Sequence, residues 1–391
     1  MIRIIGVVSS PRHGFKGSLY DIIKSKDIND TIYNIGYEGK VSNSEALLLA
    51  ALHGAHQEGA EVQLIYPGDE LPQKWDGVVM STPVYFGDRS SSLHNFISTV
   101  QLKNKAAGIV SSGAKRNGGQ ETTNIYALYD SLDKGALITG NGPPTAQYGG
   151  TGWAGNKTAI VNDDFGIKTS WGTGRQVARL AKMIDVPPDD VKANILIMKF
   201  TRDCGHDYFD ECSAYFPPKT HVRRIYIPDK KIKPCVGCPV CPNGDLSKEY
   251  KCIMKDDMKE VRQAMIWADA IIFQVGRNYS WFQNFIERTR FIRRNHFDLG
   301  ERVYSCMSIN APFTDITPIR IMTNMLRQNM FGLPFYRELK DNRNIHRLDY
   351  VHNIVLYARK SKTMRRISGI DHEYTNVGYD DAKLDEKAYR D

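Results

Sequence analysis

Four cysteines in one short segment are the residues of this chain with the clearest chemistry. Cys235, Cys238 and Cys241 follow a C-x2-C-x2-C spacing, and Cys252 comes after ten further residues. Three thiolates on one tight loop and a fourth from a nearby segment suit a cubane iron–sulfur cluster, because the loop can cover three of its corners. The spacing therefore predicts a [4Fe-4S] cluster.

Two other interpretations of these cysteines stay open. Structural zinc usually takes two separated C-x2-C or Cys/His pairs, so the third cysteine of this loop is redundant for tetrahedral zinc. Redox-active or unliganded thiols are the second alternative. Disulfides are not expected, because the N-terminal residues lack the pattern of a signal peptide and cytosolic thiols stay reduced. The remaining cysteines are scattered and indicate core or incidental thiols: Cys204, Cys212 and Cys306.

Composition places the chain among globular proteins. Its 391 residues, 41% of them hydrophobic, allow two domains with cores of their own. A transmembrane helix is not expected, since no run of 18 or more apolar residues occurs, and a cytoplasmic location is the default. The net charge of +8 comes without a nucleic-acid motif. We expect the basic segments 288–297 and 357–366 to be solvated helix faces, or docking sites for an acidic electron carrier or a phosphorylated cofactor.

Apolar strands and helices alternate through both halves of the chain. The first half predicts strands at 1–10, 60–66, 76–83 and 106–112, with a helix over Ser44–Glu58. The rhythm restarts after a proline- and acid-rich linker at 185–190. Continuous apolar strands between helices indicate parallel sheets covered on both faces. We therefore predict an α/β fold of two tandem doubly wound domains, at 1–186 and 191–345, with a C-terminal extension over 346–391.

Loops rich in hydroxyl groups follow three strands of the first half. They are residues 9–12, 81–87 and 111–121, and ligands of doubly wound sheets bind at such carboxyl ends. Short hydroxyl side chains and free amides at a helix N-terminus suit a phosphate, although Ser42 can equally cap the helix that follows it. Tyr85 and Phe86 could wall a planar ring, and Gly118 and Gly119 would let the backbone approach it closely.

These motifs resemble a known family. The order Ser-Pro-Arg, Ser-Asn-Ser, Thr-Pro-Val-Tyr-Phe-Gly and Gly-Gly-Gln-Glu is similar to the flavodoxin-like NADPH-dependent FMN reductases. PCVGCPVCP followed by KCIMKDDM resembles their iron–sulfur flavoprotein branch, which binds a [4Fe-4S] cluster beside FMN. The resemblance implies tandem flavodoxin-like domains, the first binding FMN and the second carrying the iron–sulfur loop.

Site residues follow from the resemblance by position. It assigns the FMN phosphate to Ser9, Ser10, Arg12, Ser42, Asn43 and Ser44; the ribityl chain and ring to Thr82, Pro83, Val84, Tyr85, Phe86 and Gly87; the closing loop to Ser112, Gly113, Gly118, Gly119 and Gln120; and the cluster to Cys235, Cys238, Cys241 and Cys252. No spacing identifies a catalytic proton donor.

Two departures from the family pattern shape the prediction. The first half has the flavin loops and no cysteine, whereas the second has the cysteines without the flavin loops. One FMN in the first domain and one cluster in the second are therefore expected. An insertion of 29 residues, His13–Val41, separates Arg12 from Ser42 and predicts a lid, an interface arm or a pocket wall.

The expected function is electron transfer between the cluster and FMN in a flavin-dependent oxidoreductase. Electrons would come from a ferredoxin-like carrier or from NAD(P)H and pass to a small-molecule acceptor, and the family resemblance favours a homo-oligomer. Neither nucleic acid nor a membrane is an expected partner. The alternatives are an NAD(P)H-dependent FMN or quinone reductase with a structural zinc site, and a redox sensor or scaffold without turnover.

Overall fold

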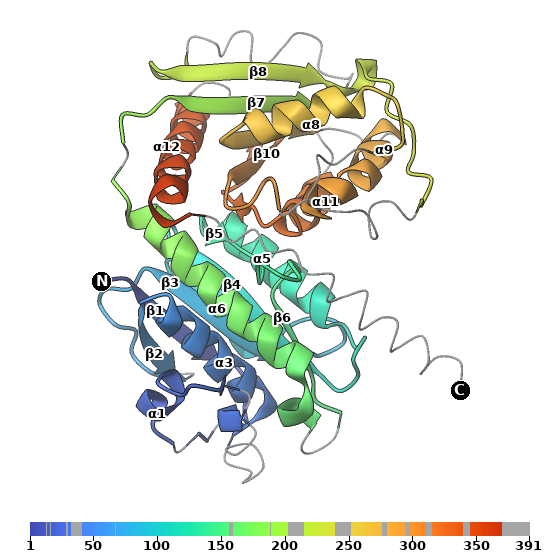
Figure 1. The fold of residues 1–391 in the computed structure, drawn as a ribbon. Helices are drawn as coiled ribbons and strands as arrows, with labels where there is room; N and C mark the ends of the chain where they lie inside the picture. The colour runs from blue at the N-terminus through green and yellow to red at the C-terminus, as the bar shows by residue number, and fades with distance from the viewer. Residues whose placement is uncertain are drawn as a thin grey trace. The chain divides into compact units, whose positions relative to one another are not determined.

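The chain divides into two compact units. The computed structural model describes residues 1–12, 14–15, 17–28, 30–32, 41–66, 68–155, 159–187, 189–201, 215–238, 252–275, 280–294, 297–309, 315–338 and 345–369. The first unit comprises Met1–Gly142 with Ala146–Asp185, and the second comprises Pro143–Thr145 with Val186–Asp391 (Figure 1).

A parallel sheet forms the centre of the first unit. Its strands are β1 (Arg3–Val8), β2 (Glu61–Ile65), β3 (Gly77–Pro83), β4 (Ala106–Gly113), β5 (Leu137–Ile138) and β6 (Gly150–Trp153). They lie in the order β2-β1-β3-β4-β5, so the strand order reverses between β1 and β3. The last strand is split, because β5 pairs with the start of β4 and β6 with its end. The carboxyl ends of β1 and β3 therefore meet at the switch point of a doubly wound sheet.

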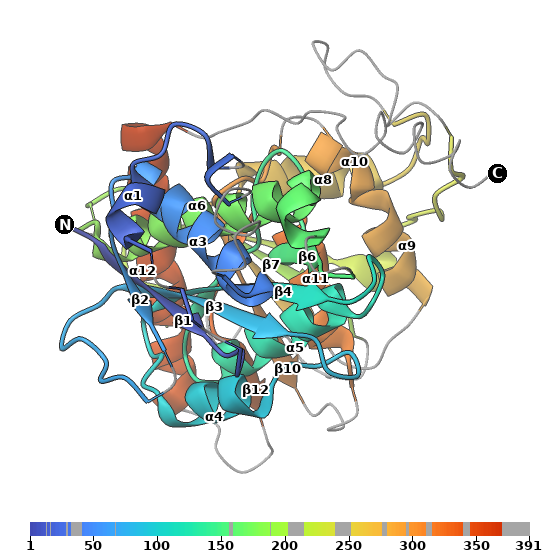
Figure 2. The same cartoon turned by 90° about the horizontal axis from the view of Figure 1, so that it is seen from below.

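Helices cover both faces of this sheet. In Figure 2, α3 (Asn43–Gln57) and α6 (Asp164–Asp185) lie on one side, and α4 (Ser91–Thr99) and α5 (Gln120–Asp133) lie on the other. Two shorter elements, α1 (Leu19–Ile23) and the 3-10 helix η1 (Ala159–Asn162), complete the unit. Nearly every residue of α3 is buried, which explains why its sequence is apolar all round.

Glycines bring the backbones of α3 and α6 together. A Cβ on Gly54 would lie 2.1 Å from the carbonyl oxygen of Trp171, and a Cβ on Gly174 would lie 1.7 Å from that of Ala51. No larger residue fits at either position without separating the helices. This close packing fixes the C-terminal half of α3 against α6.

The second unit repeats the strand order of the first. It contains β7 (Ala193–Lys199), β8 (Thr220–Tyr226), β9 (Ala270–Val275), β10 (Val303–Ile309), β11 (Phe331–Gly332) and β12 (Tyr336–Glu338). The order is β8-β7-β9-β10-β11, and β12 pairs with the end of β10 as β6 pairs with that of β4. The predicted α/β fold with doubly wound parallel sheets is confirmed. The matching split of the last strand was not predicted, and it supports an internal duplication.

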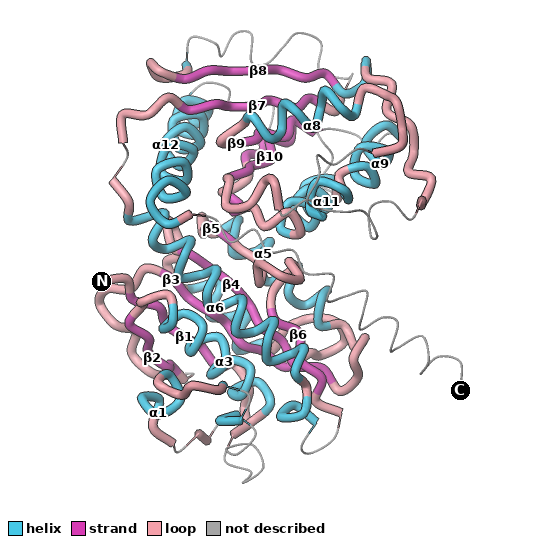
Figure 3. The backbone as a smooth tube through the Cα atoms, viewed as in Figure 1, coloured by secondary structure: helices cyan, strands magenta, loops and turns pink. Residues whose placement is uncertain are grey.

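Helices also lie on both faces of the second sheet (Figure 3). They are η3 (Ile227–Asp229), α8 (Met258–Trp267), α9 (Ser280–Arg288), α10 (Arg290–Arg294), α11 (Thr317–Leu326) and α12 (Ile345–Ser368). Side chains of α8, α9 and α11 form one core with alternate residues of β7, β9 and β10, such as Met198, Phe273 and Cys306. Within the described ranges, no helix is long and apolar enough to span a bilayer.

The C-terminal helix differs from the extension predicted over 346–391. Ile345–Ser368 forms α12, which packs against β7, β9 and β10. Val351, Ile354, Val355 and Ala358 are buried at helical spacing, and the Ser361 hydroxyl donates a hydrogen bond of 2.7 Å to the Glu301 carbonyl oxygen. Its many Lys and Arg residues conceal this narrow apolar stripe in the sequence. Residues 370–391 lie outside the described residues.

Candidate functional site

Hydroxyl groups join the ends of β1 and β3. The Ser9 hydroxyl and amide both donate to the Ser81 carbonyl oxygen, at 2.7 and 2.9 Å. Ser90, the N-cap of α4, donates to the Ser9 Oγ at 2.9 Å, and its own amide donates to the Thr82 Oγ1 at 3.0 Å. All four side chains are buried. Ser9 and Thr82 therefore fix the shape of the loops, and their hydroxyls are occupied within the protein.

The end of β4 joins the same network through the first turn of α3. The Oγ atoms of Ser44 and Ser112 lie 3.0 Å apart, and the Ser81 hydroxyl donates to the Ser44 carbonyl oxygen at 2.6 Å. The Val84 amide donates to the Ser112 carbonyl oxygen at 2.9 Å. The structure thus brings together the three loops that the sequence identified, around the carboxyl ends of β1, β3 and β4.

A two-residue turn after β3 presents the aromatic residues of the predicted ring site. Tyr85 and Asp88 exchange backbone hydrogen bonds of 2.8 and 3.0 Å across Phe86 and Gly87, whose φ angles are 52° and 80°. Two successive positive φ angles are typical of a type I′ turn. Phe86 is fully exposed and Tyr85 is about half exposed. The turn is held rigidly, and its rings are open to a planar ligand.

The glycine loop after β4 touches this turn. Gly119 has a φ of 101°, and a Cβ there would lie 2.8 Å from the Cα of Gly87. Gln120 is buried: its Oε1 accepts from the Gly118 amide at 2.8 Å, and its Nε2 donates to the carbonyl oxygens of Lys115 and Gly152. The side-chain amide of Gln120 therefore shapes the loop from inside.

Ser42 caps α3. Its Oγ accepts a hydrogen bond from the Glu45 amide at 3.3 Å, and the Glu45 Oε2 accepts one from the Ser42 amide at 2.7 Å. Glu45 is only 1% exposed, and its Oε1 accepts from the amides of Gly14 and Phe15. A buried carboxylate in the first turn opposes a second anion beside it. The cap, one of the two roles considered for Ser42, is the one that the structure shows.

Among the described residues, the amides of Asn43 and Ser44 have no hydrogen-bond partner. The first amides of a helix form a natural anion site. Arg12 is exposed, and its amide donates to the Ser10 Oγ at 3.2 Å. In the described part of the chain, Asn43 and Ser44 therefore present two backbone donors at the start of α3 that suit an anion.

The described part of the insertion runs along α3. Helix α1 packs against α3, and the His53 Nε2 lies 3.1 Å from the Ser25 carbonyl oxygen. Gly14 and Phe15 donate their amides to Glu45 in the first turn of α3. Residues 33–40 lie outside the described residues. The described residues of the insertion therefore pack against α3. That the insertion forms a lid stays a prediction for its other residues.

Trp153 lies at the same edge of the sheet. It ends β6 beside Gly113, its Nε1 donates to the Ala114 carbonyl oxygen at 3.2 Å, and its amide donates to the Asp163 Oδ2 at 2.6 Å. Asp163 is buried and also pairs with Arg116 of the glycine loop. The Arg116–Asp163 pair was not predicted, because 47 residues separate its members.

The cysteine segment lies in the second unit, between β8 and α8. Cys235, Cys238 and Cys252 are partly exposed free thiols, and Cys241 lies outside the described residues. Cys252 packs against the core of α8 and α9, and the Cys235 amide donates to the Glu287 Oε2 at 3.1 Å. Cys306 is fully buried in β10, as expected of a core thiol. The described residues contain no group of three metal-binding side chains, and the predicted set of four includes Cys241.

A buried ion pair lies directly behind Cys252. The Nη1 and Nη2 atoms of Arg288 bind the two carboxylate oxygens of Asp256 at 2.6 and 3.1 Å, and both side chains are 2% exposed. The Arg288 Nη2 also donates to the Cys252 Sγ at 3.4 Å. Burial opposes the charge of each partner, but their mutual hydrogen bonds prevail: the pKa of Asp256 is lowered and that of Arg288 is raised.

The surroundings of Cys252 fit an anionic cluster. The Arg288 Nε is buried and lacks a hydrogen-bond partner in the described part of the chain. A guanidinium that donates to a ligating sulfur is a typical outer contact of a metal site. Asp256 belongs to the Asp-Asp-Met that follows Cys252, so the sequence resemblance had already pointed to it. Arg288 was expected on a solvated helix face over 288–297, but its side chain is only 2% exposed, because it pairs with Asp256 and reaches Cys252, 36 residues earlier in the chain.

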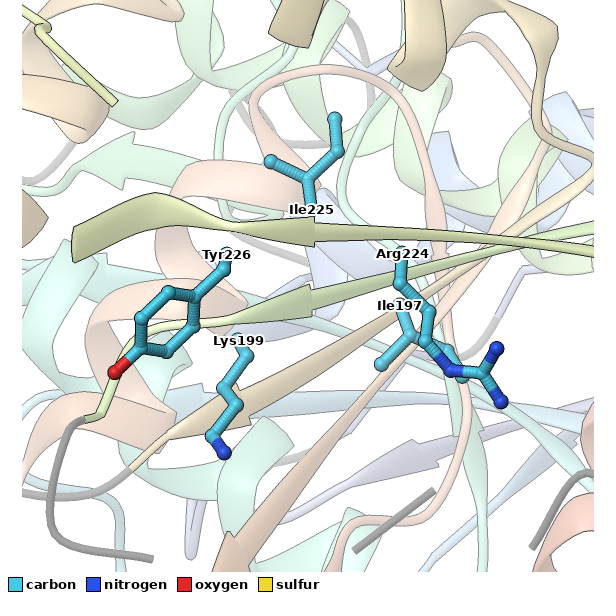
Figure 4. A pocket seen from close by; sticks show the side chains of 5 residues that line it. All are labelled: Ile197, Lys199, Arg224, Ile225 and Tyr226. Atoms are coloured by element: carbon cyan, nitrogen blue, oxygen red, sulfur yellow. The ribbon is translucent and has the colours of Figure 1, made fainter. Parts of the chain in front are cut away.

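A pocket of about 230 Å³ also opens on strands β7 and β8 of the second unit. Figure 4 shows Lys199, Arg224 and Tyr226 pointing to one side of these strands. Together with Ile197 and Ile225 they line the pocket, and none of them belongs to the predicted site. Lys199, Arg224 and Tyr226 have partners of their own, so the pocket contributes nothing to the candidate site.

Known proteins resemble this chain at the level of a family. A model of NADPH-dependent FMN reductases matches residues 70–125, which include β3, β4 and the loops that follow them. The iron–sulfur flavoprotein MJ1083 of Methanocaldococcus jannaschii is 31% identical over 200 residues, which cover 47% of this chain and 99% of that protein. An iron–sulfur flavoprotein of Methanosarcina thermophila is 25% identical over 201 residues. The match covers 47% of this chain and 97% of that protein.

Solved structures give weaker likenesses. A flavone reductase aligns with a TM-score of 0.31 and 18% identity over 47% of this chain and 64% of its own. A flavodoxin from the domain Archaea aligns with a TM-score of 0.30 and 12% identity. This alignment covers 46% of this chain and 99% of the flavodoxin. Such scores say nothing about function. The match to nearly the whole of MJ1083 at 31% identity does identify the family: this chain belongs to the iron–sulfur flavoproteins.

Proposed function

We propose that this protein passes electrons between a [4Fe-4S] cluster held by the second unit and an FMN held by the first. Family membership makes the chain a flavin-dependent oxidoreductase. The observation that carries the proposal is the division of chemistry between two units of the same strand order. Every cysteine of the chain follows residue 200, whereas the hydroxyl-rich loops gather at the switch point of the first unit.

The FMN site is built from the three joined loops. The amides of Asn43 and Ser44, with Ser10 and Arg12, would hold the phosphate, since Ser42 is engaged as the cap of α3. The ribityl chain and ring would lie along residues 82–87 and under the loop 112–120, with Tyr85 and Phe86 available for stacking. Bound there, the flavin would exchange one or two electrons. Trp153, at the same edge, adds a further aromatic contact.

The cluster site is built from the cysteine segment. Cys235, Cys238, Cys241 and Cys252 would be the ligands, and the cluster would exchange single electrons. Thiolate ligation needs reduced cysteines, which suits the cytoplasmic location expected from the sequence. Each unit would thus supply what the other lacks, within one chain or across a homo-oligomer of it. The final acceptor would be a small molecule.

The first test is the content of the protein purified without oxygen. We expect about four irons, about four sulfides and about one FMN per chain. Reduction in a stopped-flow spectrometer should bleach the cluster and flavin bands at linked rates. Zinc in place of iron and sulfide would instead favour the FMN or quinone reductase with a structural metal. A full complement of cofactors without electron exchange would favour the redox sensor.

The surface around the cysteines fits an acidic electron carrier of the ferredoxin type. Val236 and Ile253 are 60% and 52% exposed. Basic side chains surround them in the sequence, are exposed, and make no ion pair with another described residue: Lys231, Lys233, Lys255 and Lys259. Exposed basic side chains close in sequence to the cysteines favour fast, salt-sensitive association with a negative partner.

Charge reversal at this surface should slow reduction by such a carrier. For the double variant Lys231→Glu and Lys255→Glu, we expect the second-order rate to fall about tenfold at low salt, and the difference from the wild type to shrink as salt is raised. Reduction by dithionite should not change. Lys168→Glu, on the exposed side of α6 in the first unit, is the matched control. Equal rates for all three proteins would favour NAD(P)H as the donor.

A further inference from the structure

The last turn of α9 contacts both ends of the cysteine segment. Glu287 accepts a hydrogen bond of 3.1 Å from the Cys235 amide, and Arg288 donates one of 3.4 Å to the Cys252 Sγ. Cys235 and Cys252 are the first and last cysteines of the predicted cluster site. Because Glu287 and Arg288 are consecutive in a helix anchored by the buried Phe282 and Phe285, the two contacts are set by one rigid element.

The Arg288–Asp256 pair extends this support to the backbone. Arg288 Nη1 donates to the Lys233 carbonyl oxygen at 3.0 Å, and Asp256 accepts from the amides of Lys233 and Met258 at 3.0 and 3.2 Å. Lys233 lies two residues before Cys235, and Met258 is the first residue of α8. One buried ion pair therefore ties together the chain before Cys235, the chain after Cys252 and the end of α9.

Arg288 can donate hydrogen bonds to a second anion besides Asp256. Its bond to Asp256 satisfies one carboxylate, yet Nη2 also points to Cys252 and the buried Nε has no partner among the described residues. A hydrogen bond from a cation to a ligating sulfur stabilises negative charge on it, so it favours the reduced form of a cluster. Such outer contacts also hold ligands in place for the metal.

We propose that Arg288 is the positioning residue of the iron–sulfur site: it holds Cys252 for ligation and raises the reduction potential of the cluster through its hydrogen bond to Sγ. This inference rests on the proposed cluster. The inference assigns a role in the cluster site to Arg288, which lies 36 positions beyond Cys252 and outside the cysteine motif.

The test compares Arg288→Gln with the wild type, both purified without oxygen. At the midpoint potential of the wild type, the ratio of reduced to oxidised cluster should fall about tenfold, a shift of about 59 mV to more negative potential for one electron. Iron release to a chelator should be about tenfold faster. Arg288→Lys keeps the charge and loses the forked geometry, so we expect a smaller potential shift with faster release.

Arg262→Gln is the matched control. Arg262 forms a partly buried pair with Asp298 at 2.9 Å in the same unit, and no contact between it and a described cysteine is seen. The reduction potential of the cluster and the rate of iron release in Arg262→Gln should match those of the wild type. Because Arg288→Gln leaves Asp256 buried without its partner, the double variant Arg288→Gln and Asp256→Asn, which removes both charges, is measured beside it.

The outcomes separate this inference from the proposed function. A wild-type protein without iron and sulfide overturns the cluster itself. A wild-type cluster whose potential and release rate are unchanged in Arg288→Gln, or in the double variant if the single one does not fold, overturns the role of Arg288 and leaves the proposed function standing. A lowered potential and faster release in the Arg288 variants, with Arg262→Gln unaffected, support the role.

Discussion

Replacing Cys252 with alanine is expected to remove the cluster and leave the flavin in place. Cys252 supplies the fourth ligand of the predicted cubane, and an incomplete ligand set exposes one iron to solvent and to chelators. We expect iron and sulfide to fall from about four per chain to less than about one. Flavin content should stay near that of the wild type, because the FMN loops belong to the first unit.

Cys306→Ala is the control for this variant. Cys306 is fully buried in the core of the same unit and lies outside the cysteine segment. The substitution removes one sulfur atom from the core and should cost stability of about 1 kcal/mol without any loss of iron. Iron would be measured colorimetrically and by the absorption of the cluster. Full iron content in Cys252→Ala would contradict the proposed ligand set.

Replacing Gly119 with alanine is expected to weaken FMN binding by about tenfold or more, equivalent to at least about 1.4 kcal/mol. The new Cβ would lie 2.8 Å from the Cα of Gly87, so the glycine loop must move away from the turn that carries Tyr85 and Phe86. Its φ of 101° adds strain for any residue with a side chain. The dissociation constant would be measured by flavin fluorescence.

Gly68→Ala separates the contact from the backbone strain. Gly68 has a φ of 96°, close to that of Gly119, but a Cβ there would meet nothing within 4 Å. Both variants should lose stability through their positive φ angles, and FMN affinity should fall only in Gly119→Ala. The cluster content of both proteins should match the wild type. Equal FMN affinities in the two variants would place the flavin away from the glycine loop.

The sequence predicted the fold class because its signals are local. Apolar runs such as residues 77–83 and 106–113 are too continuous for half-exposed strands, and their alternation with helices leaves few arrangements besides a covered parallel sheet. The same reasoning missed α12. Its buried stripe is narrow and many of its other positions are polar or charged, so composition indicated a C-terminal extension where packing on β7, β9 and β10 stabilises a helix.

The individual roles at the flavin loops needed the structure. The sequence left Ser42 as either a cap or a phosphate ligand, and the reciprocal bonds with Glu45 show the cap. Gln120 was assigned to the loop expected to close over the flavin ring, and the structure adds that its buried side chain holds this loop from within. Such choices depend on which partner lies within hydrogen-bond distance, and residue type alone does not specify it.

What the sequence determined by itself was the chemistry that depends on spacing along the chain. The cysteine motif, the hydroxyl-rich loops and their separation between two halves can all be read from neighbouring residues, because each is carried by a single short segment. The tertiary structure alone decided which distant residues serve those segments. Arg288 reaches Cys252, and Gly119 meets Gly87, only because the sheets bring the ends of different strands and helices to one place, and packing over the whole unit sets that distance.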